Sequence, residues 1–171
     1  MLRHVAAILA LPFMVTIVIP AVLITQTQAV YPGWDALFPL NMLLYILGLL
    51  LIGVGLLLVL MTVGLFATVG QGTLAPWDPT QRLVVIGIYR YVRNPMISGV
   101  FAILLGEGVM LGSLPVLSWA LIFIVINMIY IPLSEEPGLH ARFGADYDDY
   151  AHNVPRWLPR RSPWTPPATR G

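Results

Sequence analysis

The stretch Gly87-Ile88-Tyr89-Arg90-Tyr91-Val92-Arg93-Asn94-Pro95 stands between two long apolar segments and carries two arginines and two tyrosines. Its last residue suits the first turn of a helix, where the missing N–H of proline costs no hydrogen bond. A second polar junction, Ser134-Glu135-Glu136-Pro137, follows another apolar segment. The rest of the chain is organised around these two junctions.

The composition is that of a membrane protein. Of the 171 residues, 58% are hydrophobic and only 10% are charged, whereas soluble domains carry about 25% charged residues. All nine basic residues are arginine, which excludes Schiff-base and P-loop lysines, and the absence of cysteine excludes disulfides and thiolate chemistry. A net charge of +1 gives no reason to expect nucleic-acid binding. We therefore expect one small, all-α membrane domain over residues 1–171.

Four apolar segments predict four transmembrane helices, at about residues 5–25, 37–69, 97–112 and 116–133. About 20 apolar residues cross the hydrocarbon core, so the second segment must tilt, bend or project beyond it. Residues 1–4 resemble the basic start of a signal peptide, but no convincing cleavage site follows, which favours a retained first span. Only Ser113-Leu114-Pro115 separates the third and fourth segments, which predicts a helical hairpin.

Small residues recur along the second and third segments. Gly48, Gly55 and Thr62 are spaced by seven and fall near one helix face, and Gly108 and Gly112 are spaced by four. Small residues on one face let another helix approach closely, so helix packing is the plainer interpretation. Such packing is compatible with contacts inside one chain or between copies in a homo-oligomer.

The arginines predict the orientation. They lie in the two termini and in the loop at 70–94, and the remaining two loops have none. The positive-inside rule then places both termini and this loop in the cytoplasm. Both polar junctions would share that face of a multi-pass protein, most simply in a bacterial cytoplasmic membrane.

Each junction has a functional and a plainer interpretation. Arg93 and Asn94 present donors beside a helix N-terminus, which favours an anion such as a carboxylate, but arginines also anchor proteins to lipid headgroups. Glu135 and Glu136 could bind a cation or sugar hydroxyls, or they could belong to a helix start capped by Ser134.

Two further features complete the candidate chemistry. Glu107 lies inside the third span, where an ionised carboxylate is costly, so it binds substrate, is protonated or pairs with an arginine. The tail predicts an amphipathic helix, with Phe143, Tyr147 and Tyr150 on one face, folded over the cytoplasmic end of the bundle. The histidines (His4, His140 and His152) show no helical i,i+4 pair, so no metal is expected.

The pattern Gly87-x-Tyr89-x-x-x-Arg93-x-Pro95, followed by Glu135-Glu136-x-x-Leu139-x-x-x-Phe143-Gly144-x-x-Tyr147-x-x-Tyr150-x-x-x-Val154-Pro155-Arg156, resembles the integral membrane methyltransferases. These include isoprenylcysteine carboxyl methyltransferases and phospholipid N-methyltransferases, and the resemblance covers residues 81–159. It implies a helical bundle that binds S-adenosylmethionine on its cytoplasmic side. A lipid-like or small hydrophobic methyl acceptor would enter from the membrane lipids.

Carried over by position, the resemblance implies a cofactor site in the loop at 70–96 and the tail at 134–160. Gly53-Val54-Gly55 and Glu135-Glu136-Pro137 are similar to motifs of the phospholipid branch. The implied cofactor-binding residues are Gln81, Arg82, Leu83, Val84, Tyr89, Arg93, Asn94, Pro95, Met96, Ile97, Gly53, Gly55, Glu135 and Glu136. The candidate catalytic residues are Glu107, Glu136 and Arg156.

Three positions depart from the wider family and leave the acceptor open. Asn94 stands where histidine is usual, although the phospholipid branch is similar in having Asn-Pro-Met, and Ile97 stands where an aromatic is usual. Ile131 occupies the place of an arginine in the prenylcysteine enzymes. The alternatives are an NADPH-dependent membrane reductase similar to steroid reductases, a four-span transporter, and a non-catalytic accessory protein.

Overall fold

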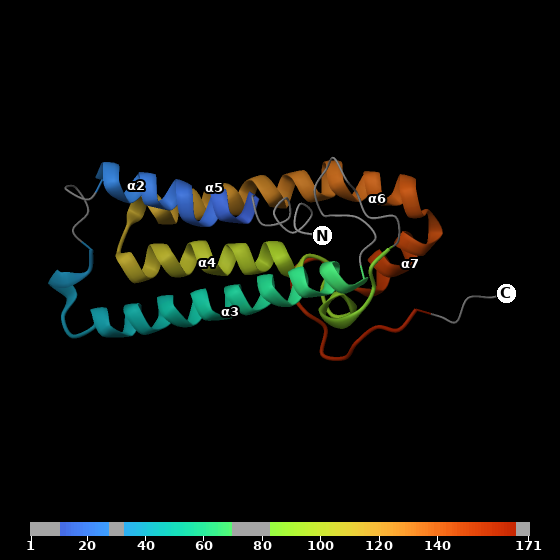
Figure 1. The fold of residues 1–171 in the computed structure, drawn as a ribbon, viewed down its shortest axis with the longest axis horizontal. Helices are drawn as coiled ribbons and strands as arrows, with labels where there is room; N and C mark the ends of the chain where they lie inside the picture. Colours follow the sequence, from blue (N-terminus) through green and yellow to red (C-terminus); the bar gives the residue numbers. More distant parts are fainter. Residues whose placement is uncertain (1–10, 28–32, 70–82, 167–171) are drawn as a thin grey trace.

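The computed structural model describes residues 11–27, 33–69 and 83–166, and of residues 66–69 only the backbone (Figure 1). Within these ranges the regular structure is helical, without a strand, which confirms the all-α prediction. Two helices, Asn41–Leu65 and Leu114–Phe143, are long and apolar enough to cross a membrane, and the apolar helices Leu11–Thr27 and Pro95–Leu111 are shorter. Residues 5–10 of the predicted first span and 70–82 of the predicted cofactor loop lie outside the described residues.

The first helix contains a π turn, η1 (Met14–Val18), which continues into α2 (Ile19–Thr27). In this turn the Ile19 N–H bonds to the Met14 carbonyl, five residues back. The same register would pair Pro20 with the Val15 carbonyl, but proline has no N–H. The Trp119 indole Nε1 donates to that carbonyl at 3.1 Å instead. The hydrogen bond ties the first helix to α5 (Leu114–Tyr130).

We expect Trp119→Phe to lower the free energy of unfolding by about 1 kcal/mol, because interhelical hydrogen bonds in membrane proteins are of this size. The phenyl ring keeps the contact with Phe123, whose ring lies 6.1 Å from that of Trp119. Unfolding in detergent measures the change. Trp157→Phe is the control, since Trp157 packs on Phe101 at 5.3 Å and makes no hydrogen bond within the described chain. Equal losses in both variants would contradict the prediction.

The second helix, α3 (Asn41–Val69), begins after a short 3-10 turn, η2 (Asp35–Leu37), and Pro39. It runs antiparallel to α4 (Pro95–Leu111), and paired glycines bring the two backbones together. A Cβ on Gly55 would lie 2.5 Å from the Gly99 carbonyl oxygen, and a Cβ on Gly48 would lie 2.7 Å from that of Gly106. The predicted packing role of Gly48 and Gly55 is therefore confirmed.

Helices α4 and α5 are joined by Gly112 and Ser113. Gly112 adopts a φ of +62°, and the Ser113 hydroxyl accepts a hydrogen bond from the Val116 N–H at 3.4 Å as the N-cap of α5. The Trp34 indole donates to the Val109 carbonyl at 2.6 Å, which fastens the segment before α3 to this end of α4. Proline at the first turn of each helix sets where α4 and α5 begin.

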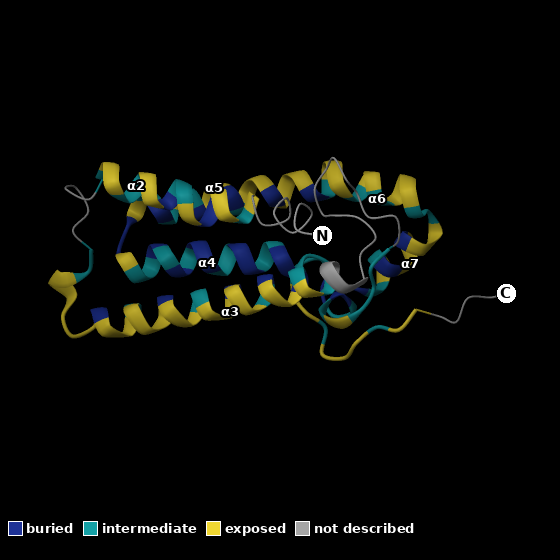
Figure 2. Ribbon diagram, viewed as in Figure 1, coloured by how far each residue is buried: buried dark blue, intermediate teal, exposed yellow. Residues whose placement is uncertain are grey.

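Helix α4 is the centre of the bundle, between α3 and α5 (Figure 1). Its residues are mostly buried or half-buried, whereas large parts of α3 and α5 are exposed (Figure 2). The exposed side chains are apolar; Leu49 and Leu60 on α3, for example, are 64% and 65% exposed. Apolar surface of this extent is typical of a protein that contacts a membrane.

The C-terminal region corrects two predictions. Helix α5 runs through a second π turn, η4 (Ile131–Glu135), directly into α6 (Glu136–Phe143), so Ser134 lies inside a continuous helix and caps nothing. Gly144, with a φ of +54°, ends α6 before α7 (Ala145–Asn153). The predicted single amphipathic helix is thus two helices, although Phe143 still packs with Tyr147 and Tyr150.

Candidate functional site

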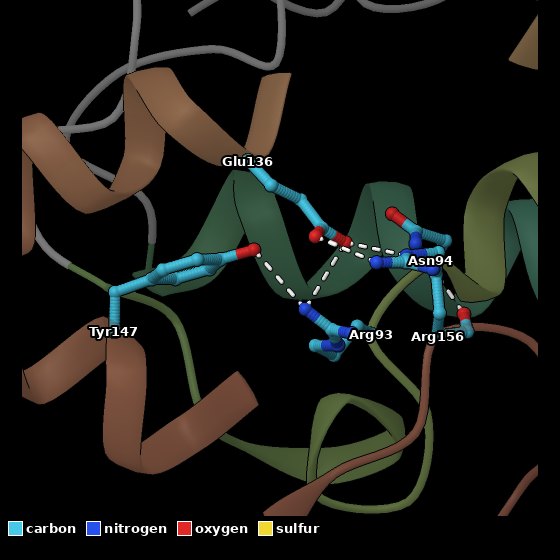
Figure 3. Close-up of polar contacts among 5 residues, drawn as sticks. All are labelled: Arg93, Asn94, Glu136, Tyr147 and Arg156. Carbon is cyan, nitrogen blue, oxygen red and sulfur yellow. Dashed lines mark hydrogen bonds and ion pairs between the residues drawn. The ribbon is translucent and has the colours of Figure 1, made fainter. Parts of the chain in front are cut away.

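Two arginines meet one carboxylate where α4 begins and α6 begins (Figure 3). Arg156 donates to Glu136 through Nε at 2.6 Å and through Nη2 at 2.8 Å, one bond to each carboxylate oxygen. Arg93 Nη1 lies 3.0 Å from Oε1 of the same carboxylate. The side chains of Arg93 and Glu136 are only 11% and 17% exposed. Bidentate, charge-assisted pairs are strong, so this arginine–glutamate cluster (Arg93, Glu136, Arg156) ties distant segments together.

Backbone contacts support the cluster. Pro95 is fully buried at the first position of α4, which places Arg93 and Asn94 in the turn just before the helix. The Arg93 N–H donates to the Pro155 carbonyl at 2.9 Å, and the Asn94 side-chain amide donates to the Arg156 carbonyl at 3.3 Å. The segment that carries Arg156 is thus held on the same turn that carries Arg93.

The tail continues along the first junction as a strap, residues 154–165. The Arg160 N–H donates to the Tyr91 carbonyl at 3.0 Å, and the Trp164 N–H donates to the Arg90 carbonyl at 2.9 Å. The Arg90 side chain returns a hydrogen bond from Nε to the Trp164 carbonyl at 2.7 Å and also contacts Thr165. Arg90 is therefore engaged with the tail. Nothing in the local sequence pattern indicated this strap, because its bonds are made by backbone groups far apart in the chain.

Three tyrosines surround the cluster as neutral phenols. The Tyr147 hydroxyl accepts a hydrogen bond from Arg93 Nη1 at 3.2 Å, and the Tyr150 hydroxyl donates to the Tyr89 carbonyl at 2.8 Å. Burial, and then the nearby Tyr150 and Glu135, raise the pKa of the Tyr89 phenol. Burial, and then the charge of Glu136, raise the pKa of Tyr147 although Arg93 opposes the shift. These hydroxyls therefore keep their protons at neutral pH.

The two adjacent glutamates differ in their surroundings. Glu136 is held by both arginines, and its hydrogen bond raises the pKa of the Arg156 guanidinium. Glu135 is exposed and makes no hydrogen bond or ion pair within the described chain. It lies close enough to Tyr89 and Tyr147 for its charge to act on both phenols. One carboxylate at this site is neutralised. Its neighbour, whose pKa is raised by burial of the carboxyl group and then by the charge of Glu136, has no partner among the described residues.

The family model of phospholipid methyltransferases matches residues 43–146, more than half of the chain. The chain belongs to the phospholipid methyltransferase family. No curated protein and no solved structure is similar enough to match it. The matched range contains all but the first two residues of α3, all of α4, and both polar junctions with the pair Glu135-Glu136. Membership indicates a methyltransferase with membrane-spanning helices, and members of this family generally use S-adenosylmethionine.

Most of the residues predicted to bind the cofactor of this methyltransferase lie at the same end of α4 as the cluster. Val84 and Met96 pack with Tyr89, and Leu83 packs with Tyr147 and Tyr150. Ile97 is half-buried in the first turn of α4. Gln81 and Arg82 lie outside the residues that the structure describes.

Glu107, a catalytic candidate named from the sequence, lies on α4 apart from the arginine–glutamate cluster. It is twelve residues beyond Pro95 on α4, which is about 18 Å along the helix axis. Its Oε2 atom is buried and has no partner among the described residues. Glu107 is therefore not part of the arginine–glutamate cluster, and its catalytic role stays a prediction.

The two glycines predicted to contact the cofactor have different surroundings. Gly55 packs closely against Gly99 of α4, whereas a Cβ on Gly53 would have no neighbouring heavy atom within 4 Å. Ile131, in place of the arginine of prenylcysteine enzymes, is 1% exposed, so no charge is available there. Within the described ranges no group of three or more His, Asp or Glu side chains could hold a metal ion.

Proposed function

We propose that this member of the phospholipid methyltransferase family transfers a methyl group from S-adenosylmethionine to a lipid-like or small hydrophobic acceptor at the cytoplasmic membrane face. In this proposal residues 1–171 form one domain with four spans, the third and fourth a hairpin, and the α6–α7 tail covers the cytoplasmic end. Both termini are cytoplasmic. The observation that carries the proposal is that Glu135, which has no partner among the described residues, lies beside the neutralised arginine–glutamate cluster. Glu135, Arg93 and Glu136 are inside the range that matches the family.

The residues at this end of α4 fit the cofactor. The carboxylate of Glu135 suits an ammonium group or ribose hydroxyls, because its oxygens accept no hydrogen bond from the described residues. Arg93 Nε is buried without a hydrogen-bond partner among the described residues, and it lies beside the N-terminus of α4. The Nε group of Arg93 and the N-terminus of α4 both suit the carboxylate of the cofactor. Arg90, the other arginine of the first junction, is engaged with the strap.

When bound, S-adenosylmethionine supplies a methyl group activated by a sulfonium, so the protein mainly has to align the acceptor with it. Positioning of this kind can supply about 7–11 kcal/mol of the barrier reduction. Glu136, Arg93 and Arg156 keep α4, α6 and the strap in one arrangement and thereby position the site. We assign Glu136 and Arg156 this positioning role, because a carboxylate held by two guanidinium groups is a poor base. An amine or thiol acceptor must lose a proton, whereas a carboxylate acceptor needs no base.

We expect Glu135→Gln to weaken the binding of S-adenosylmethionine roughly 10- to 100-fold, the equivalent of one hydrogen bond to a charged group. The unfolding temperature should not fall, because Glu135 makes no ion pair within the described chain and its charge lies beside that of Glu136. Calorimetry on detergent-purified protein measures the affinity. Asp146→Asn is the control, because it removes the same charge from an exposed position on α7. The proposal fails if the unmodified chain does not bind the cofactor, or if Glu135→Gln binds it equally well.

The acceptor can be found without assuming its class. Untargeted lipid mass spectrometry of cells with and without the gene should show a lipid that gains the mass of one methylene unit only when the protein is present. NADPH should not displace labelled S-adenosylmethionine from the purified protein. Displacement by NADPH would favour a reductase instead.

A further inference from the structure

The helix that leads to the two glutamates contains one wider turn. In η4 the Glu136 N–H donates to the Ile131 carbonyl, five residues back instead of four. Pro132 lies in this turn, where it lacks an N–H and its ring crowds the carbonyl four residues before it. A π turn holds one more residue than an α turn. Such turns occur frequently at functional sites.

The extra residue changes which glutamate faces the arginines. Each residue advances an α-helix by about 100° and about 1.5 Å. Without the π turn, every later residue would move by one position, so Glu135 would take the place of Glu136 and Ser134 that of Glu135. An acidic side chain would face Arg93 and Arg156 in either register. Only the π register leaves a second carboxylate in the exposed position.

We propose that the π turn Ile131–Glu135 is a positioning device that assigns Glu136 to the arginine–glutamate cluster and Glu135 to the ligand. Both sides of the turn are anchored. Upstream, Ala120, Phe123 and Asn127 are buried on α5. Downstream, Leu139 and Phe143 pack against the buried cluster of Tyr147, Tyr150 and Val154. The extra residue must be absorbed between these anchors, and Leu133 in the turn is 74% exposed.

The assignment of Glu136 to the arginines rests on contacts in the structure alone. The assignment of Glu135 to a ligand rests on the proposed function. The two parts are separated by measuring stability and binding independently in the full-length protein.

Two deletions of one residue test the turn. Pro132→Ala combined with deletion of Leu133 removes the extra residue and the proline, so α5 and α6 keep their relative orientation. We expect the unfolding temperature of this variant to stay near that of the parent and its affinity for S-adenosylmethionine to stay within about twofold.

The second deletion is the control. Deletion of Ile122, which is 52% exposed, shortens the same helix between the buried Ala120 and Phe123. It should abolish binding and lower the unfolding temperature, because it puts one anchor out of register. Equal damage from both deletions would overturn the proposal.

An insertion tests the exchange of roles. One alanine inserted between Leu133 and Ser134 should place Glu135 against Arg93 and Arg156. In this variant Glu135→Gln should lower the unfolding temperature and Glu136→Gln should not, the reverse of the parent chain, and S-adenosylmethionine binding should be lost. A merely structural helix defect would produce no such exchange. If Glu136→Gln is the destabilising substitution in both backgrounds, the proposal is wrong.

The readouts also separate this proposal from the proposed function. If the parent chain does not bind S-adenosylmethionine yet the exchange in stability occurs, the register assignment stands and the cofactor assignment falls. If the insertion variant does not fold, the two deletions decide, because their unfolding temperatures require no exchange.

Discussion

Glu136→Gln is expected to lower the free energy of unfolding by about 2–3 kcal/mol. Breaking a buried ion pair by removing one partner costs about 3–5 kcal/mol, and the 34% exposure of the Arg156 side chain reduces that cost. The substitution leaves two guanidinium groups facing each other, with Arg93 only 11% exposed. Equilibrium unfolding in detergent measures the loss. Affinity for S-adenosylmethionine should fall as well, because the strap and the start of α4 lose their common anchor.

The neighbouring residue supplies the matched control. Glu135→Gln makes the same chemical change one position earlier, and we expect it not to lower stability, because it removes a charge beside Glu136. The double variant Glu136→Gln/Arg156→Gln should be less destabilised than the sum of its single variants, because residues in one ion-pair network are not additive. Equal stability of the Glu135 and Glu136 variants would show that the arginine–glutamate cluster does not hold the tail.

Gly55→Ala is expected to lower the free energy of unfolding by about 1–3 kcal/mol, the usual cost of overpacking a well-packed contact. The new methyl group would lie 2.5 Å from the Gly99 carbonyl oxygen and 2.6 Å from the side chain of Ile103. A backbone oxygen inside a helix cannot move aside as the end of a side chain can. The two helices must therefore separate, and the loss would appear as a lower unfolding midpoint in detergent.

Gly53→Ala is the matched control on the same helix. A Cβ there has nothing within 4 Å, so we expect unchanged stability or a gain of up to about 1 kcal/mol, because alanine is the better helix former. The comparison also tests the cofactor role predicted for the pair. If both glycines contacted S-adenosylmethionine, both variants would lose affinity, whereas a packing role predicts a loss of stability in Gly55→Ala alone.

Much of the fold could be predicted from apolar segments and prolines. The predicted span at 37–69 is α3 from Asn41, and the predicted span at 97–112 is α4 from Pro95. The differences of a few residues occur where Pro39 precedes a helix and where Pro95 begins one. The π turn and the break at Gly144 were not predicted, because a single extra residue or one glycine hardly alters the hydrophobic pattern of the tail.

The candidate site was predicted as a set of residues but not as an arrangement. Arg93, Glu136 and Arg156 were all named from the sequence, with Glu136 and Arg156 as catalytic candidates. In the structure these three residues pair with one another, and Glu135 is therefore the glutamate that we propose to contact the ligand. Glu107 was named because a carboxylate in hydrocarbon is costly, and that reasoning carries no information about its distance from the other junction.

The sequence by itself determined that the described part of this protein is helical, that it has helices able to cross a membrane, and that the chain belongs to the phospholipid methyltransferase family. The helical fold follows from local chemistry, because a backbone in hydrocarbon must satisfy its hydrogen bonds within each helix. Only the tertiary structure decided which of the two adjacent glutamates contacts the arginines. It also decided that Gly55 packs against α4, and that the tail forms hydrogen bonds with Arg90 and Tyr91. These outcomes depend on contacts between residues far apart in the chain, and on a register that differs by a single residue.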